Sequence, residues 1–321
     1  MRNTLILVTV LIGLVSCNNT KQKKVERTEI SLDSIIVMPN WEEESIINLE
    51  LKKTKTITRN GMTQWGSSTS KVELIISKND NNTWSGKWSI KDIQTPSINN
   101  PLEKKIEKLV NGFVYDFVLD STGIITGLTN WEDIQSKGFE ALELVIDEVK
   151  GQPTMNPQIV EQIRMGVGEM FNSKEKIETY LMQEVQLFFA LNGYAGIPMT
   201  KKDTIIGLSY IQHPLTGDII EQTINTTYQK AYSDSTCDIK ISQIINNDDL
   251  QKATQNTVKK FGGEDKASEY QNGMSDAKFD VDIVSSYNYS MISGLVQNVI
   301  ATKTITVGTE KRIDKTEIVL K

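Results

Sequence analysis

The sequence predicts an α+β fold built on a long curved antiparallel sheet, an open half-barrel with helices packed on its concave face or mouth. Apolar and polar residues alternate in two separate blocks, 44–130 and 204–321, as they do in half-buried strands. A helical block, 131–193, lies between them. Runs of strands with segregated helices are typical of α+β proteins, and long strands curl the sheet that they form. We therefore expect a single domain over 44–321.

The strands of the first block show a period of two. Ile47, Leu49 and Leu51 alternate with polar residues, and Trp84 and Trp88 lie on one face of a later strand. Further along, the segment Asp120-Ser121-Thr122-Gly123 separates two apolar runs. This segment predicts a hairpin, because glycine adopts the positive φ angle that such a turn requires.

Three amphipathic helices are expected in the middle block. The first has an apolar face made of Phe139, Leu142, Val145, Ile146 and Val149. Asn156 is the expected N-cap of the second helix, and Pro157 takes its first position. The third is expected to begin at Ser173 and to end at Asn192-Gly193, a glycine C-cap. Their apolar stripes need a partner surface, and we expect that partner to be the sheet.

The last block returns to strands, which we expect at 219–232, 236–245, 279–291, 295–307 and 312–320. One helix interrupts them, and Asn247 is its expected cap. Acidic residues at its start and Lys259 and Lys260 at its end complement the helix dipole. Gly262-Gly263 is expected to end it.

The N-terminal residues 1–16 have the pattern of a secretory signal peptide. Arg2 precedes a short apolar run, which cannot span a bilayer because a spanning helix needs roughly 20 apolar residues. The segment Leu14-Val15-Ser16-Cys17 resembles the lipobox of bacterial lipoproteins. That resemblance implies cleavage before Cys17, a diacylglyceryl group on its thiol, and an acyl chain such as palmitate on its amine. The alternative is an ordinary signal peptide followed by a chance cysteine.

Residues 17–43 are expected to form a lipidated tether. The stretch 18–24 is polar and basic, with nothing to bury. It has neither the aspartate that resembles an inner-membrane retention signal nor the acidic cluster linked to surface export. We therefore expect the protein in the cell envelope, anchored to the outer membrane and facing the periplasm.

Charge and residue usage narrow the classes of function. A net charge of −6, without a basic patch beyond the tether, argues against a nucleic-acid partner. The only histidine, His213, is expected in a turn. A single histidine excludes a histidine-rich metal site and argues against a Ser-His-Asp triad. Cys237, in a strand-like run, is expected to be a small apolar side chain. We expect no cofactor, no metal and no catalytic residues.

Two sets of side chains are candidates for binding or modification. The aromatic residues Trp84, Trp88, Phe188 and Phe189 are candidates to line an apolar cavity between helix and sheet, with ordinary core packing as the alternative. Four Asp-Ser or Asp-Thr triplets resemble the acceptor of a periplasmic O-glycosylation system. That resemblance would place glycans on Ser34, Ser121, Thr204 and Ser235, and plain turn formation is the alternative.

The strand-helix-strand order, with the segment from Asn111-Gly112-Phe113-Val114-Tyr115 to the Asp120–Gly123 hairpin, resembles a family of uncharacterised Gram-negative lipoproteins of the outer-membrane type. More distantly, the layout resembles periplasmic lipoprotein and lipid carriers, which are open β-barrels capped by helices. The resemblance covers most of the mature chain as architecture, and it transfers no carrier residue position by position.

Three functions remain open from the sequence. The first is a non-enzymatic binding module for an apolar ligand or lipid, held to the membrane through Cys17. The second is an envelope scaffold that exposes an apolar patch or a sheet edge to a partner protein. The third, which we rank last, is an enzyme that uses two carboxylates, for instance on glycans.

Overall fold

The computed structural model describes residues 28–94, 111–150, 157–213, 216–274 and 279–321. Within these residues, one sheet has twelve strands and a second has two. The strands of the N-terminal block are β1 (Glu29–Ile30), β2 (Ser34–Ile36), β3 (Glu44–Arg59), β4 (Met62–Lys78), β5 (Trp84–Gln94), β6 (Val114–Leu119) and β7 (Ile125–Leu128). The remaining strands are β8 (Pro198–Thr200), β9 (Thr204–Gln212), β10 (Ile219–Tyr232), β11 (Thr236–Ile245), β12 (Phe279–Ser290), β13 (Val296–Val307) and β14 (Glu310–Leu320).

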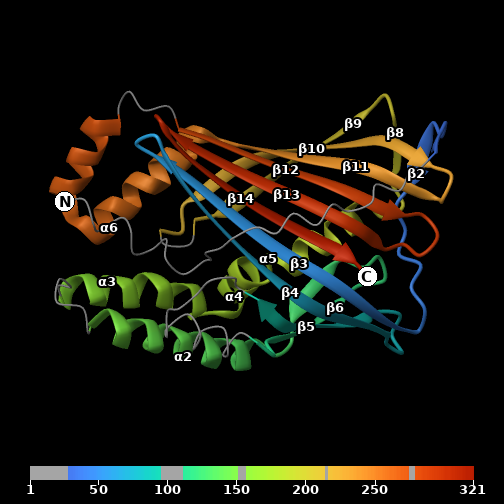
Figure 1. Ribbon diagram of the computed structural model, residues 1–321, viewed down its shortest axis with the longest axis horizontal. Helices are drawn as coiled ribbons and strands as arrows, with labels where there is room; N and C mark the ends of the chain where they lie inside the picture. The colour runs from blue at the N-terminus through green and yellow to red at the C-terminus, as the bar shows by residue number, and fades with distance from the viewer. Residues whose placement is uncertain (1–27, 95–110, 151–156, 214–215, 275–278) are drawn as a thin grey trace.

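The large sheet joins the two predicted strand blocks. Its order is β1-β10-β11-β12-β13-β14-β3-β4-β5-β6-β7, and β9 also pairs with β10. The last strand, β14, runs antiparallel to β3, with Leu320 opposite Leu49. All its described pairings are antiparallel, and the sheet does not close into a barrel (Figure 1). The predicted class, an α+β open half-barrel, is confirmed.

One face of the sheet carries the main core. Leu51 lies opposite Ile318 of β14, and Val299 of β13 follows in the same row. Directly opposite residues share a face of a sheet, and these three side chains are all buried. Val185 and Phe188 of α5 (Gln183–Phe189) belong to the same core cluster, so this is the face that the helix covers.

The other helices are α2 (Trp131–Lys150), α3 (Pro157–Gly168), α4 (Lys174–Leu181) and α6 (Asn247–Met274), with short 3-10 turns η2 (Glu169–Phe171) and η3 (Ala190–Tyr194). Pro157 is the first residue of α3, as predicted, whereas Asn156 lies outside the described residues. The Ser173 hydroxyl accepts a hydrogen bond from the Lys176 backbone N–H at 3.3 Å, which confirms the predicted start of α4.

The expectation that the first two helices pack mainly on the sheet is wrong. Helix α2 packs against α3, η2 and α4, and the α2–α3 hairpin lies below the sheet in Figure 1. Leu142 and Ile146 are buried, while Phe139 is exposed and contacts Phe171 of η2. The two stripes cover each other because an amphipathic helix hairpin can bury its own apolar faces.

The predicted third helix is divided in two. Met182 interrupts the helical hydrogen bonds between α4 and α5, and its side chain is fully buried. The Gln186 side chain donates to the Glu178 carbonyl oxygen at 2.9 Å across this break. Gly193 is not a left-handed C-cap, because α5 already ends at Phe189 and Gly193 continues a 3-10 turn.

Helix α6 differs from the prediction at both ends. The Asn246 side chain, rather than that of Asn247, accepts hydrogen bonds from the backbone N–H groups of Asp248 and Asp249. Gly263 does interrupt the helix, at φ 83°, but a second helical segment continues to Met274. Ala253 of α6 packs with Ile220, Ile245 and Val281 in a small separate core near this end of the sheet.

The segment expected to be a tether has structure in its described part. Ile35, Val37 and Trp41 are buried in the main core, and β2 pairs with β8. The alternation of Ile35 and Val37 is the signal of a strand. The lipidation residue Cys17 and the signal peptide lie outside the described residues.

Candidate functional site

The aromatic candidates come together in the main core. Trp88 of β5 meets Phe188 edge to face, and Phe188 meets Phe189 in the same way. Trp84 meets Trp41, which in turn contacts Phe189. Trp88, Phe188 and Phe189 are 0%, 3% and 5% exposed, so their rings mainly contact one another and the sheet. Whether any of the four lines a ligand stays a prediction.

One buried polar atom in this cluster belongs to Trp88. The indole Nε1 of Trp88 is buried and has no hydrogen-bond acceptor among the residues that the structure describes. A buried N–H without an acceptor costs roughly 1–3 kcal/mol. The cluster is therefore apolar in character, and its indole N–H finds no acceptor in the described part of the chain.

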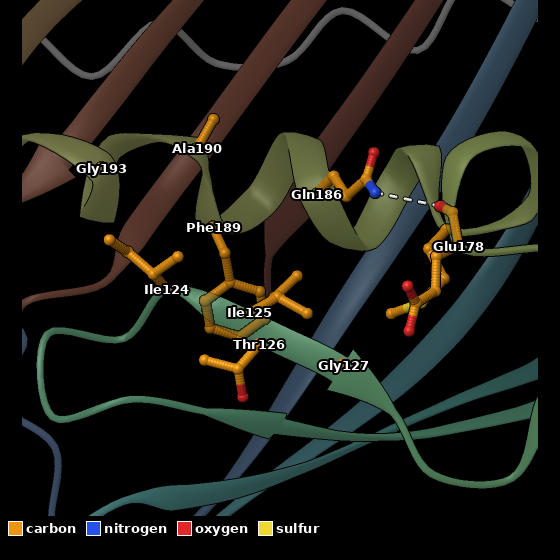
Figure 2. A pocket seen from close by; sticks show the side chains of 10 residues that line it. Ile124, Ile125, Thr126, Gly127, Glu178, Gln186, Phe189, Ala190 and Gly193 are labelled. Atoms are coloured by element: carbon orange, nitrogen blue, oxygen red, sulfur yellow. Dashed lines mark hydrogen bonds between the residues drawn. The ribbon is translucent and has the colours of Figure 1, made fainter. Parts of the chain in front are cut away.

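An open pocket lies beside this cluster, between α5 and the edge strand β7 (Figure 2). Its volume is about 290 Å³, close to the lower end of about 300 Å³ that is common for small-molecule sites. Phe189 of α5 and Ile125 of β7 point into the space between the two elements. The pocket is lined by Ile124, Ile125, Thr126, Gly127, Glu178, Met182, Gln186, Phe189, Ala190 and Gly193.

The two long polar side chains that line the pocket, Glu178 and Gln186, already make hydrogen bonds within the protein. Glu178 accepts a hydrogen bond from the Leu128 backbone N–H at 2.7 Å, and Lys174 lies 3.8 Å from the same oxygen. Gln186 donates across the helix break, as the dashed line in Figure 2 shows. Glu178 therefore holds α4 against β7, and Gln186 joins α5 to α4. The rest of the lining is mainly apolar.

The hairpin that brings β7 to this pocket was predicted from its sequence. Asp120 accepts hydrogen bonds from the backbone N–H groups of Thr122 and Ile124, and Gly123 has φ 81°. Burial by itself would raise the pKa of Asp120, but the Thr122 hydroxyl and the backbone N–H groups together lower it. Asn192 donates to the Gly123 carbonyl oxygen at 2.9 Å and so fixes the hairpin to η3.

The glycosylation candidates lie in four separate places. Ser34 and Thr204 are exposed at the starts of β2 and β9, and Ser121 is exposed at the hairpin tip. Ser235 is half-buried in a turn at φ 59°, where Asp234 accepts from Thr236. The aspartates at 120 and 234 thus act as turn formers, and modification of these hydroxyls stays a prediction.

Cys237 and His213 are the cysteine and the histidine that the structure describes. Cys237 is fully buried, and burial raises the pKa of its thiol to about 12, so the thiolate is not formed at neutral pH. The His213 ring is half-buried and lies 3.1 Å from the Thr216 hydroxyl. In the described residues, no group of three or more His, Cys, Asp or Glu side chains is arranged to hold a metal ion. No helix in that part of the chain is both long and apolar enough to cross a membrane.

The comparisons with known proteins give weak structural likenesses. No protein-family model matches the sequence, and no curated protein matches it. A lipovitellin structure, described by its lipid-protein interactions, has a TM-score of 0.40 and 9% identity, and it covers 89% of this chain. This chain spans 25% of the lipovitellin chain.

Two further structures match over most of both chains. DynF, from the dynemicin biosynthesis pathway of Micromonospora chersina, has a TM-score of 0.19 and 6% identity, with 97% of this chain and 96% of DynF covered. A putative outer-membrane lipoprotein-sorting protein domain from Vibrio parahaemolyticus has a TM-score of 0.15 and 8% identity, with 85% and 83% covered. Every one of these TM-scores is below 0.5, so none of them assigns a family or a function. What defines the class of this protein is its own fold, an open antiparallel half-barrel with helices on one face.

Proposed function

We propose that this chain is a lipid-anchored protein of the cell envelope that binds an apolar ligand, such as one acyl chain, without catalysing a reaction. The observation that carries the proposal is the apolar pocket between α5 and β7, with Phe189 in its lining. Burial of apolar ligand surface there would provide affinity at about 25 cal/mol per Å². The resemblance of Leu14-Val15-Ser16-Cys17 to a lipobox supports the anchor. The residues after Cys17, which include neither the retention aspartate nor the acidic export cluster, support a location on the periplasmic side of the outer membrane.

Gly193 offers a clean test of this pocket. A Cβ added at Gly193 would meet no atom within 4 Å, and the residue does not have a positive φ. Gly193→Phe therefore places a ring in the pocket without backbone strain. Gly193→Ala is the matched control, because it adds one methyl group to the same position.

The experiment is native mass spectrometry of residues 18–321, produced in a bacterial periplasm without the lipid. We expect the wild type and Gly193→Ala to carry extra mass that leaves on extraction with organic solvent, and Gly193→Phe to lose at least half of it. A wild-type protein at its bare sequence mass would overturn the proposal. If Gly193→Phe carried as much ligand as the wild type, the ligand would bind elsewhere, and the assignment of this pocket as its site would be wrong.

A second function, an envelope scaffold, is favoured by the edge strand β9. Ile206, Leu208 and Tyr210 lie on one face of β9 and are 71%, 58% and 59% exposed. Among the described strands, β9 pairs with β10 alone, so its other edge is available to a partner. Exposed apolar side chains on an edge strand are typical of protein contacts.

A photo-crosslinking residue at Leu208 tests this alternative in cells. A scaffold would give one discrete crosslinked partner from position 208, and none from the exposed Asn48 on β3 as the control site. Equal or absent crosslinking at the two positions would remove this candidate and leave ligand binding.

A further inference from the structure

The edge strand β9 has no feature of its own that would keep another strand away (Figure 1). None of its 9 residues, Thr204–Gln212, is charged or a proline, and its register with β10 runs without a bulge. Charged residues, proline and bulges are the usual devices that stop an edge strand from pairing with another chain. By its sequence and geometry, β9 can therefore accept a further antiparallel strand.

The strand at the other end of the sheet, β7, is protected in a way that β9 is not. It has only 4 residues, and Glu178 accepts a hydrogen bond from its Leu128 backbone N–H at 2.7 Å. That edge is therefore short and partly covered by α4. By contrast, Ile206, Leu208 and Tyr210 of β9 are each more than half exposed.

The backbone groups that point away from β10 belong to the even-numbered residues of β9. The His213 N–H donates to the Asp218 carbonyl oxygen at 2.7 Å, in the pair that continues the register of β9 with β10. Bonded and non-bonded pairs alternate along antiparallel strands. The N–H and C=O groups of Thr204, Gln212 and the even-numbered residues between them therefore point outward. The Tyr180 hydroxyl of α4 donates to the Gln212 carbonyl oxygen at 3.2 Å, which agrees with this alternation and marks one end of the available edge.

The side chains of β9 have the same pattern in both directions from Leu208. Residues at equal distances from it are alike in size and polarity. From the centre outward, these pairs are Gly207 and Ser209, Ile206 and Tyr210, Ile205 and Ile211, and Thr204 and Gln212. When two copies of one strand pair about a two-fold axis, residues at equal distances from the axis lie opposite each other. With Leu208 on the axis, each apolar side chain would lie opposite an apolar one, and no charges would meet.

The backbone fits the same symmetric register. With the axis on Leu208, Ile206 lies opposite Tyr210 of the other copy, so outward-pointing groups meet outward-pointing groups and can bond. An axis between two residues would set outward-pointing groups opposite inward-pointing ones and lose these hydrogen bonds. An axis on Gly207 or Ser209 would keep the hydrogen bonds, but it would set isoleucine opposite serine or glycine.

We propose that two copies of this chain pair through β9, antiparallel and centred on Leu208, so that their two large sheets become one. The inference does not depend on a ligand in the pocket, and it names the occupant of the edge that the scaffold candidate offers to a partner. Pairing of two strand edges buries little surface, and interfaces below about 1,200 Å² are typical of weak complexes. We therefore expect a dissociation constant in the micromolar range, and a shared membrane anchor would favour the dimer.

Leu208→Lys is the variant that tests the pairing, because it sets two like charges opposite each other on the two-fold axis. Ile244→Lys is the matched control. Ile244 is 57% exposed, against 58% for Leu208, and it lies in the same row of the outer face, two strands further into the sheet. Its charge would disturb an association through the apolar face but not one through the edge. Circular dichroism of each variant verifies that the fold is unchanged.

Sedimentation velocity of residues 18–321, over a range of concentrations, measures the association. We expect the wild type and Ile244→Lys to dimerise with the same dissociation constant, and Leu208→Lys to weaken the dimer at least about tenfold. An equimolar mixture of Leu208→Lys and Leu208→Glu is expected to restore it, because opposite charges then meet on the axis. This recovery requires that residue 208 of one copy lies opposite residue 208 of the other.

Three outcomes would overturn the inference. The first is a wild type that stays monomeric up to about 300 µM, far above the micromolar range; a crosslink from position 208 to a different protein would then support the scaffold instead. The second is equal weakening by Leu208→Lys and Ile244→Lys, which would assign the association to the apolar face. The third is a mixture that does not recover, which would remove Leu208 from the axis.

The test is separate from that of ligand binding. We expect Leu208→Lys to carry the same extractable mass as the wild type in native mass spectrometry, because β9 does not line the pocket. A failure of the self-pairing would therefore leave the proposed ligand binding standing, and a protein without ligand could still dimerise through β9.

Discussion

At the scale of single residues, side-chain hydrogen bonds fix the turns that shape the pocket. Asp120 accepts from the Thr122 hydroxyl and from two backbone N–H groups, and the hairpin it closes supplies Ile124 and Ile125 to the pocket. Asp234 makes the same contacts with Thr236. In each turn, the aspartate carboxylate therefore accepts hydrogen bonds from backbone N–H groups that have no strand partner.

Asp120 gives a pH-dependent prediction. Because its folded-state pKa is lowered, its carboxylate stabilises the fold above the ordinary carboxyl pKa of about 3.9, and this contribution is lost as the pH falls through the folded value. We expect Asp120→Asn to lower the free energy of unfolding at pH 7 and to have a clearly smaller effect at pH 3, measured by urea denaturation. Asp80→Asn, in an exposed turn, is the control. An equal loss at both pH values would contradict a role for the charge.

At the scale of elements, turns and breaks decide where each strand and helix points. Asn60 and Gly61 have φ 50° and 75° and join β3 to β4, the two longest strands described. Two positive φ angles in a two-residue loop match the right-handed twist of the strands. The break at Met182 has a comparable effect in the helices, because it directs α5 over the sheet while α4 contacts α2.

Gly61→Ala tests the hairpin. A Cβ at Gly61 would meet no atom within 4 Å, so its cost comes from the backbone alone. We expect a loss of roughly 1–2 kcal/mol in the free energy of unfolding, the cost of a left-handed conformation. Gly193→Ala has the same open surroundings without a positive φ, and its effect is expected to be neutral or favourable. Equal effects of the two substitutions in thermal denaturation would contradict the turn assignment.

At the scale of the whole molecule, one strand, β14, joins the two halves of the large sheet. Strands β10 to β13 and strands β3 to β7 are linked through β14, which lies between β13 and β3. Ile318 of β14 is buried between Leu51 and Val299, so β14 also completes the core. A contact between the two ends of a chain requires closure of a long loop, and we expect this sheet to fold slowly.

Removal of residues 310–321 tests this arrangement. We expect the truncated chain to lose cooperative unfolding and to become sensitive to protease, because β3 and β13 would each expose a long unpaired edge. The control is Lys321→Ala, which removes only the exposed partner of Glu50. A truncated chain with the wild-type unfolding midpoint would show that the two halves of the sheet are stable independently.

Much of the fold follows from local sequence. The period of two predicted β10 and β11 to the residue, and Asp120 to Gly123 predicted the hairpin, because strand and turn preferences depend on neighbouring residues. Asn60-Gly61 and the alternation of Ile35 and Val37 carried equally local signals for a hairpin and for β2. By contrast, the division at Met182 and the capping by Asn246 depend on which side chains find partners in the folded chain.

The sequence by itself determined the α+β class, the two strand blocks and the apolar faces of the helices, since each is a short-range pattern. Only the tertiary structure decided that the blocks share one sheet through β14 and that Trp88, Phe188 and Phe189 contact one another. It also decided that the pocket lies beside α5. The physical reason is that strand partners and helix docking depend on contacts between residues far apart in the chain, which no local period specifies.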